Sequence, residues 1–314
     1  MKIAIIGPGA LGCLLAAKFK SAGEEVWLVD YRPGRIDLLN RQGIFLKTSN
    51  GTETIVKIPV GDASRVGPVD LAILTVKAHQ TRTAAPSLPP LVGSAGFALT
   101  LQNGLGNLEE MAQVLGPERL LGGASILGAT KLGEGEVLLA GLGPTYVGPP
   151  PGSRVPPAQV EAVAALFRRA GLPCEVRSDI ESVLWEKLLV NVGINPLTAI
   201  LRIKNGVLPN LSPAWNLAVA AAFETQAVAL ASGIILKVDP EARLREVCLA
   251  TAANRSSMLQ DILAGRRTEI EALNAQVAAR GAGHGIPTPV NHTLTQLIRA
   301  LEEAQGCRGG GQGK

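Results

Sequence analysis

Aromatic residues and histidines are scarce in this chain of 314 residues, of which 3% are Phe, Trp or Tyr and three are His. The net charge is only +4, without a basic block. The chain therefore lacks the cationic runs and interleaved stacking residues that nucleic-acid binding usually needs. His79, His284 and His292 do not have the i, i+4 spacing that lets two imidazoles share a metal ion. We expect neither a nucleic-acid partner nor a metal site.

Cysteines are also few, and the longest apolar stretches are interrupted. The four cysteines contain no C-x-x-C pair, so we expect free thiols rather than disulfides or a zinc site. They are Cys13, Cys174, Cys248 and Cys307. Leu184–Leu201 and Ala214–Ile235 are apolar but contain charged and amide residues, which a membrane span would exclude. These features favour a cytoplasmic protein with no membrane partner.

Two kinds of pattern follow one another along the chain. Up to about residue 178, short β-rich runs alternate with helical stretches, and several runs lack polar alternation, as strands buried on both faces do. We predict strands over Lys2–Ile6, Glu25–Asp30, Val69–Val76, Phe97–Leu101 and Cys174–Arg177. Beyond Asp179 the pattern predicts helices over Ile180–Ala199, Ala214–Ser232, Pro240–Leu263, Thr268–Gly283 and Val290–Ala304.

A glycine motif lies between the first predicted strand and a predicted helix over Leu14–Ala22. The residues Gly7, Pro8, Gly9, Ala10, Leu11 and Gly12 have the G-x-G-x-x-G spacing. The first glycine permits a tight turn, the second lets the backbone approach a pyrophosphate, and the third allows close packing of helix and strand. The helix N-terminus then offers amide donors to the phosphates. In this context the motif predicts dinucleotide binding, and a turn kept only for packing is the alternative.

The residues after the second predicted strand affect which dinucleotide binds. Asp30 lies where an acid commonly accepts hydrogen bonds from the ribose of NAD, while Arg32 and Arg35 are close enough to pair with the extra phosphate of NADP. Both arginines could equally be solvated surface charges. These residues alone leave the choice between NADP(H) and NAD(H) open.

Together the patterns predict two domains. A chain of this length usually exceeds one hydrophobic core, and its 46% hydrophobic content supports two. We predict an α/β Rossmann-type dinucleotide-binding domain over residues 1–178 and an all-α domain over residues 179–304, with the active site in the cleft between them. Residues 305–314 include five glycines, and we expect this tail to be disordered.

A polar stripe marks the first helix of the predicted all-α domain. Lys187, Asn191 and Asn195 recur at i, i+4 and i+8 and therefore share one face of a helix that is otherwise almost entirely apolar. Such groups would be costly in a dry core, so we expect them to line a cleft, where the ammonium group can stabilise and protonate a carbonyl oxygen. The alternative is that the stripe is simply the solvent-facing side.

The segment that carries this stripe, Trp185–Ile200, resembles the signature segment of the ketopantoate (2-dehydropantoate 2-) reductase family. The resemblance spans both predicted domains, because it recurs at Val76–Ala78, Gln102–Gly104, Ser256–Asp261 and Thr268–Ile270. Two places depart from the family pattern. Asp30 with a shifted Arg32 differs from the arginine that often follows the second strand, and the sequence around Asn205 matches poorly.

The resemblance implies a role for each matching residue. It places the catalytic general acid at Lys187 and the carboxylate near the substrate hydroxyl and the cofactor at Glu269. It implies substrate contacts from Asn103, Asn191, Asn195, Asn205, Asn254 and Ser257, of which Asn254 and Ser257 hold the substrate carboxylate. The cofactor is then expected to be bound by the glycine motif and by Asp30, Arg32, Lys77, Asn103 and Ala129.

By this resemblance the chain is an NADPH-dependent oxidoreductase that converts 2-dehydropantoate to (R)-pantoate in pantothenate biosynthesis. NADP(H) is then favoured over NAD(H), and a homodimer is the expected assembly. A 3-hydroxyacid dehydrogenase-like reductase of another small keto acid, or a non-catalytic nicotinamide-binding protein, are the alternatives. Turnover of a panel of keto acids would separate these three functions.

Overall fold

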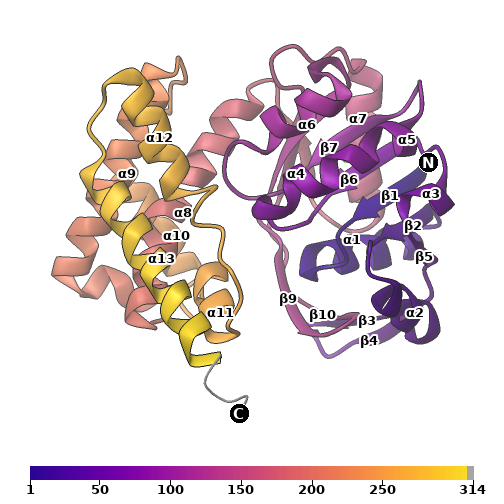
Figure 1. The fold of residues 1–314 in the computed structure, drawn as a ribbon, viewed down its shortest axis with the longest axis horizontal. Helices are drawn as coiled ribbons and strands as arrows, with labels where there is room; N and C mark the ends of the chain where they lie inside the picture. Colours follow the sequence, from indigo (N-terminus) through magenta and orange to yellow (C-terminus); the bar gives the residue numbers. More distant parts are fainter. Residues whose placement is uncertain (310–314) are drawn as a thin grey trace. The chain divides into compact units, whose positions relative to one another are not determined.

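A computed structural model describes residues 1–309 of the protein and the side chains of residues 1–306, and residues 310–314 lie outside the described part. The chain divides into two compact units, which are coloured along the sequence in Figure 1. The first unit comprises Met1–Gln102 and Asn107–Glu181, and the second comprises Asn103–Gly106 and the chain from Ser182 onward. The short segment Asn103–Gly106 thus belongs to the second unit by its contacts.

The first unit is built on an eight-stranded sheet with the order β12-β11-β8-β7-β6-β1-β2-β5. Its strands are β1 (Lys2–Ile6), β2 (Glu25–Val29), β5 (Val60–Gly61), β6 (Leu71–Leu74), β7 (Phe97–Thr100), β8 (Leu120–Ser125), β11 (Thr145–Gly148) and β12 (Cys174–Val176). All neighbouring strands run parallel except β8 and β11. Each of the five predicted strands is present, with ends up to two residues shorter than expected.

Both faces of this sheet are buried, which explains why its strands lack polar alternation. Ile3 and Ile5 of β1 pack into the core beneath α1 (Ala10–Ser21) and α7 (Pro157–Arg169). Ala4 and Ile6 point the other way, into a second core. The helices of that face are α3 (Ala63–Val66), α5 (Leu88–Val92) and α6 (Asn107–Leu115), with α4 (Thr81–Ala84) beside α6. A strand with a core on each side has no position for a polar side chain.

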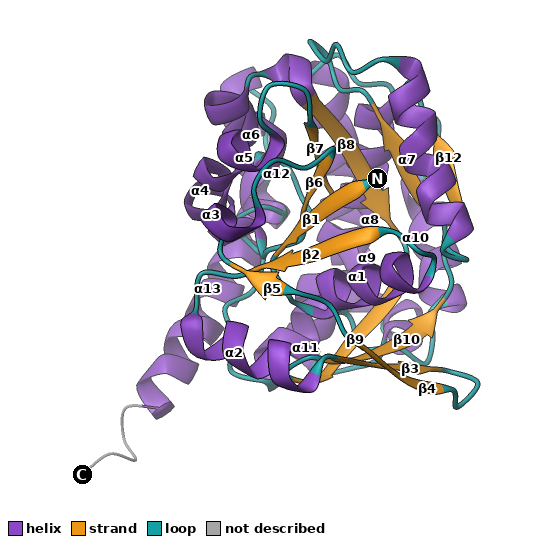
Figure 2. Cartoon of the chain, turned by 90° about the vertical axis from the view of Figure 1, so that its right-hand side faces the viewer, coloured by secondary structure: helices purple, strands orange, loops and turns teal. Residues whose placement is uncertain are grey.

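A second, four-stranded sheet with the order β4-β3-β10-β9 was not predicted. Its strands are β3 (Ile44–Thr48), β4 (Glu53–Val56), β9 (Gly128–Gly133) and β10 (Glu136–Gly141). Helix α1 contacts strands of both sheets and so lies between them, as Figures 1 and 2 show. Figure 2 also shows α2 (Pro33–Gln42) beside the small sheet. The contact with α1 buries Val137 and Leu139 of β10 in the first core.

The second unit is helical. Its helices are α8 (Ile180–Leu201), α9 (Ser212–Ala231), α10 (Pro240–Ala250), α11 (Ser257–Leu263), α12 (Asn274–His284) and α13 (Pro289–Gly309), with a 3-10 segment, η4, at Asn205–Asn210. The predicted order of an α/β unit followed by a helical unit is therefore confirmed. A buried polar network joins four of these helices. Asn274 donates to Val192 O at 3.1 Å and to Asn291 Oδ1 at 3.0 Å, and Asn291 donates to Glu224 Oε2 at 2.7 Å. Such bonds fix helix positions because unpaired buried amides are costly.

Two helix predictions need correction. The helix predicted over Pro240–Leu263 is two helices, because the Ser256 side chain caps a new start by accepting from Leu259 N at 3.1 Å. The helix predicted from Thr268 begins only at Asn274, because the Thr268 hydroxyl accepts from Ile270 N and forms a side-chain turn.

The predicted disordered tail also needs correction. Helix α13 continues to Gly309, and the Gln305 side chain donates to Ile262 O at 2.6 Å, which anchors the last turns despite the glycines. The remainder of that predicted tail, residues 310–314, and the side chain of Cys307 lie outside the described part.

Candidate active site

The predicted glycine motif forms the turn between β1 and α1. Gly7 has a φ of +100°, and a Cβ there would lie 2.6 Å from Val76 Cγ1. A Cβ on Gly12 would lie 2.1 Å from Gly7 O. Nothing lies within 4 Å of the position that a Cβ on Gly9 would take. The first and third glycines are therefore required by packing, whereas the second faces open space from which a phosphate group can reach the backbone.

The start of α1 suits an anion. Ala10 and Leu11 are its first residues, its first turn contains no acidic side chain, and Pro8 precedes its Gly9 N-cap. The Thr75 hydroxyl donates to Gly7 O at 2.8 Å and so holds the turn in place. A helix of this length with an unobstructed N-terminus supplies amide donors and partial positive charge to a phosphate.

Asp30 follows β2 with its side chain only 2% exposed. Its carboxylate accepts from the backbone of Tyr31 at 2.7 Å and of Arg32 at 3.1 Å. It also forms ion pairs with Arg32 at 3.2 Å and Arg35 at 3.3 Å. Arg35 is only 12% exposed and is not a solvated surface charge, whereas Arg32 keeps 48% of its side chain exposed. Both arginines therefore form ion pairs with Asp30.

Lys77 and Ala129 occupy separate positions in the first unit. Lys77 is half-buried just after β6, and the Gln102 side chain donates to the preceding carbonyl of Val76 at 2.9 Å. Gln102, two residues beyond β7, therefore fixes the backbone beside Lys77. Ala129 is half-buried on β9, where it pairs with Leu139 of β10.

The predicted polar stripe lies on α8. Asn195 is 6% exposed, and Lys187 and Asn191 are half-buried, so the stripe is not a solvent-facing side. Burial lowers the pKa of Lys187 from 10.5 to about 8, and the negative charge of Glu269 opposes this shift. A lysine with such a pKa is still largely protonated at neutral pH but gives up its proton more readily than an exposed lysine.

Asn103 and Glu269 are 166 positions apart in the sequence and form a hydrogen bond. The Nδ2 atom of Asn103 donates to Oε2 of Glu269 at 3.1 Å. Glu269 is only 7% exposed, and it lies on a turn rather than on the expected helix. The next residues fix this contact: Leu105 N donates to Ala272 O at 2.9 Å, and a Cβ on Gly104 would lie 2.1 Å from that oxygen. The structure thus brings Asn103, Glu269 and Lys187 into one cluster.

The remaining predicted residues lie around the start of α11. Ser257 is its first residue and is exposed, and Asn254 is exposed on the preceding loop. Asn205, 8% exposed at the start of η4, donates its backbone N–H to Asn254 O at 3.0 Å and its Nδ2 group to Thr251 Oγ1 at 2.9 Å. Neighbouring Ser256 lies 2.7 Å from the hydroxyl of Thr198 on α8. This segment is therefore attached to the helix that carries the stripe.

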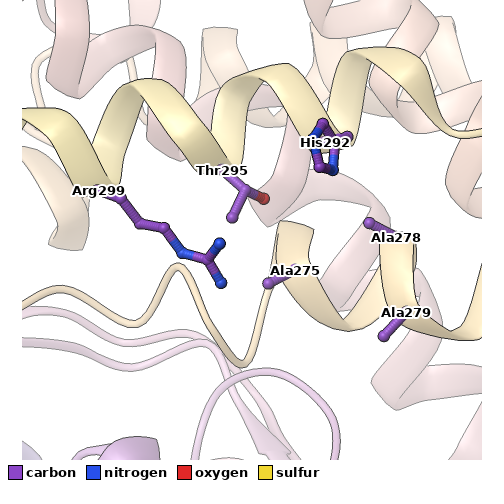
Figure 3. A pocket seen from close by; sticks show the side chains of 6 residues that line it. All are labelled: Ala275, Ala278, Ala279, His292, Thr295 and Arg299. Atoms are coloured by element: carbon purple, nitrogen blue, oxygen red, sulfur yellow. The ribbon is translucent and has the colours of Figure 1, made fainter.

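A pocket of about 260 Å³ lies between α12 and α13, and Figure 3 shows the side chains that line it. They are Ala275, Ala278, Ala279, His292, Thr295 and Arg299. None of the catalytic, substrate-binding or cofactor-binding residues predicted from the sequence lines this pocket. Its Arg299 forms two 2.7 Å hydrogen bonds with Glu271 and is therefore already paired with a carboxylate. The pocket is not the candidate active site.

Within residues 1–309, no group of three or more His, Cys, Asp or Glu side chains could hold a metal ion. No helix in the same part of the chain is long and apolar enough to cross a membrane.

Comparison with known families identifies the relationship. Residues 3–152 match the family model described as ketopantoate reductase PanE/ApbA, and residues 179–302 match its C-terminal model. The chain belongs to the ketopantoate reductase family. Its similarity extends to a 2-dehydropantoate 2-reductase of Archaeoglobus fulgidus, which is 38% identical over 96% of this chain and 98% of that protein. A 2-dehydropantoate 2-reductase of Halobacterium salinarum is 35% identical over 96% of this chain and 99% of that protein.

Solved structures of related proteins have the same fold. A PanE/ApbA family ketopantoate reductase from Ralstonia eutropha JMP134 superposes with a TM-score of 0.88 at 31% identity, covering 98% of this chain and 100% of that one. A ternary structure of D-mandelate dehydrogenase with NADH and anilino(oxo)acetate superposes with a TM-score of 0.92 at 27% identity, covering 98% and 99%. Solved proteins of this fold therefore include both a ketopantoate reductase and a D-mandelate dehydrogenase.

Proposed function

We propose that this protein reduces 2-dehydropantoate to (R)-pantoate with a nicotinamide cofactor, a step of pantothenate and coenzyme A biosynthesis. The observation that carries the proposal is the cluster of Lys187, Glu269 and Asn103. A lysine whose pKa is lowered by burial is suited to donate a proton to a ketone oxygen. The full-length similarity to curated 2-dehydropantoate 2-reductases supports the substrate.

The first unit has the features that a nicotinamide dinucleotide requires. Open space in front of Gly9 and the N-terminus of α1 fit a pyrophosphate, and Asp30 follows the strand at whose end the ribose is usually bound. We propose that Lys77, Asn103 and Ala129 contact the rest of the cofactor.

We propose further that NADP(H) is preferred over NAD(H), with the exposed guanidinium of Arg32 pairing with the 2′-phosphate. Arg32→Ala should weaken NADPH binding about tenfold and leave NADH binding unchanged. Arg41→Ala, at the other end of α2, is the control and should change neither. Equal effects of Arg32→Ala on both cofactors would contradict the preference.

When bound, the reduced nicotinamide supplies a hydride to the ketone carbon. The Lys187 ammonium donates a proton to the ketone oxygen, so that a new O–H bond forms and the side chain becomes a neutral amine. The nearby carboxylate of Glu269 keeps the ammonium protonated before the reaction, because it opposes the effect of burial on the pKa. Solvent then returns the proton to the amine.

The asparagines and the serine provide recognition. A small anionic keto acid offers few atoms, so donors must hold its carboxylate while an acceptor meets its hydroxyl group. We propose that exposed Asn254 and Ser257 bind the carboxylate, and that Asn191 and Asn195 on α8 bind its other polar groups. Glu269 accepts a hydrogen bond from the hydroxyl group of the substrate. Asn205 holds the backbone of Asn254 in place through the hydrogen bond from its N–H to Asn254 O.

The decisive experiment is a turnover assay with purified protein, 2-dehydropantoate and either NADPH or NADH, monitored by nicotinamide absorbance. We expect multiple turnovers and (R)-pantoate as the product. Cofactor binding without oxidation of either cofactor would overturn the catalytic proposal and favour a non-catalytic nicotinamide-binding protein.

A second candidate substrate is a 2-keto acid with an aromatic group. The similarity to D-mandelate dehydrogenase favours it, because that fold matches this chain over nearly its whole length. The same assay with benzoylformate compares the two substrates. A kcat/KM at least tenfold higher for 2-dehydropantoate would support the first proposal, and the reverse order would support the second.

A further inference from the structure

The charged groups at the end of β2 extend to the turn between β9 and β10. Besides its ion pair with Asp30, the Arg35 side chain donates to the carbonyl of Pro8 in the glycine turn. Its Nε atom lies 2.6 Å from Oε2 of Glu134, which belongs to the β9–β10 turn. Arg35 thus joins the glycine turn, the acid after β2 and a hairpin about 100 residues away in sequence.

The hairpin turn is held against α2 by contacts of its own. Gln42 of α2 donates to the carbonyl of Glu134. Gly135 has a φ of +74°, and a Cβ there would lie 2.7 Å from Leu39 Cδ2, so a larger residue would push the turn off the helix. The position of Glu134 beside Arg35 therefore follows from backbone packing and not only from the ion pair.

The side chains around Arg35 carry charges of both signs, which affects the binding of a charged ligand there. Lys131, Arg32 and Arg35 are cationic, and Asp30 and Glu134 are anionic, with Lys131 paired to Glu134. The two carboxylates contact different nitrogens of Arg35, Asp30 at Nη1 and Glu134 at Nε. A phosphate at the 2′ position would have to share this guanidinium with them, whereas the plain ribose of NAD brings no charge and would not compete.

We propose that Glu134 is a specificity-determining residue that weakens binding of the 2′-phosphorylated cofactor by occupying and neutralising Arg35. The proposal rests on the dinucleotide site proposed above but not on the identity of the keto acid. Glu134 acts through Arg35 and is a positioning residue. Its removal should release a cation for the 2′-phosphate and should not affect the pyrophosphate or nicotinamide contacts.

The test measures dissociation constants of NADPH and NADH without substrate, by cofactor fluorescence, for the wild-type protein and Glu134→Gln. The side chain of Glu134 is 43% exposed, so solvent screens its charge and the effect is modest. We expect NADPH to bind about two- to fivefold more tightly to Glu134→Gln and NADH to bind as before. The gain should shrink as the salt concentration rises.

Two further variants make the result specific. Glu136→Gln removes the same charge from an exposed position on β10 of the same hairpin and should leave both constants unchanged. In the background of Arg35→Ala, Glu134→Gln should no longer favour NADPH, because the coupled partner is missing. An unchanged ratio of the two constants in Glu134→Gln, or an equal gain in Glu136→Gln, would overturn the proposal while leaving the dinucleotide site standing. Failure of the wild-type protein to bind either cofactor would overturn both.

Discussion

The hydroxyl of Thr198 on α8 lies 2.7 Å from the hydroxyl of Ser256, which is 58 positions further along the chain. Thr198 is nearly one helical turn beyond Asn195, the last residue of the polar stripe, and Ser256 directly precedes Ser257. Both hydroxyls are buried. This single contact therefore holds together two parts of the proposed substrate site that are distant in sequence.

Replacing Thr198 with Val should remove this contact without changing the size of the side chain. We expect a loss of about 1 kcal/mol in the free energy of unfolding, because Ser256 loses a buried partner, and a several-fold rise in KM with a smaller change in kcat. Thr225→Val on α9 is the matched control, since Thr225 is equally buried and bonds only within its own helix, to Ala221 O at 2.8 Å. A KM that is unchanged in Thr198→Val would show that this contact does not position the site.

Lys187→Ala should lower kcat by about a hundredfold or more, the scale expected for a positioned general acid, with little change in cofactor affinity. The melting temperature should not fall, because burial opposes the charged form of Lys187. Lys204→Ala replaces an exposed lysine of the same unit and should behave as wild type. Near wild-type turnover in Lys187→Ala would exclude Lys187 as the acid.

The pH dependence of reduction should follow the pKa of Lys187. Because this pKa is about 8, the ammonium is present below that pH, and kcat/KM should fall as the pH rises through about 8. The negative charge of Glu269 raises the pKa of Lys187. Glu269→Gln removes that charge and should therefore move the alkaline limb of the profile to lower pH. Measured pH profiles of both proteins test this. An alkaline limb that stays in place in the variant would mean that another group controls it.

Ser257→Ala should mainly raise KM, because the substrate carboxylate is bound equally in the ground state and the transition state. Its exposed position at the start of α11 predicts little loss of stability. Paired kinetics and melting temperatures separate these effects. Full activity, or a loss of activity that only follows a loss of stability, would remove Ser257 from the site.

Local patterns in the sequence were sufficient for the main elements of the fold. The spacing of Lys187, Asn191 and Asn195 predicted one helix face, because helical periodicity is a local property, and all three lie on α8. The apolar strands predicted a sheet buried on both sides, which the two cores on β1 confirm. Two strands of the four-stranded sheet give no reliable signal of burial, because apolar Ile55 of β4 is 61% exposed and β9 has no buried residue.

Only the tertiary structure decided which side chains meet and what charge they carry. The hydrogen bond of Asn103 to Glu269 joins a loop after β7 to a turn before α12, and no local pattern encodes that pairing. The pKa of Lys187 depends on how much water its neighbours remove, and the availability of Arg35 depends on Asp30 and Glu134 beside it. Propensity and periodicity act over a few residues, whereas desolvation and ion pairing depend on distances in space, which are fixed only when the chain has packed.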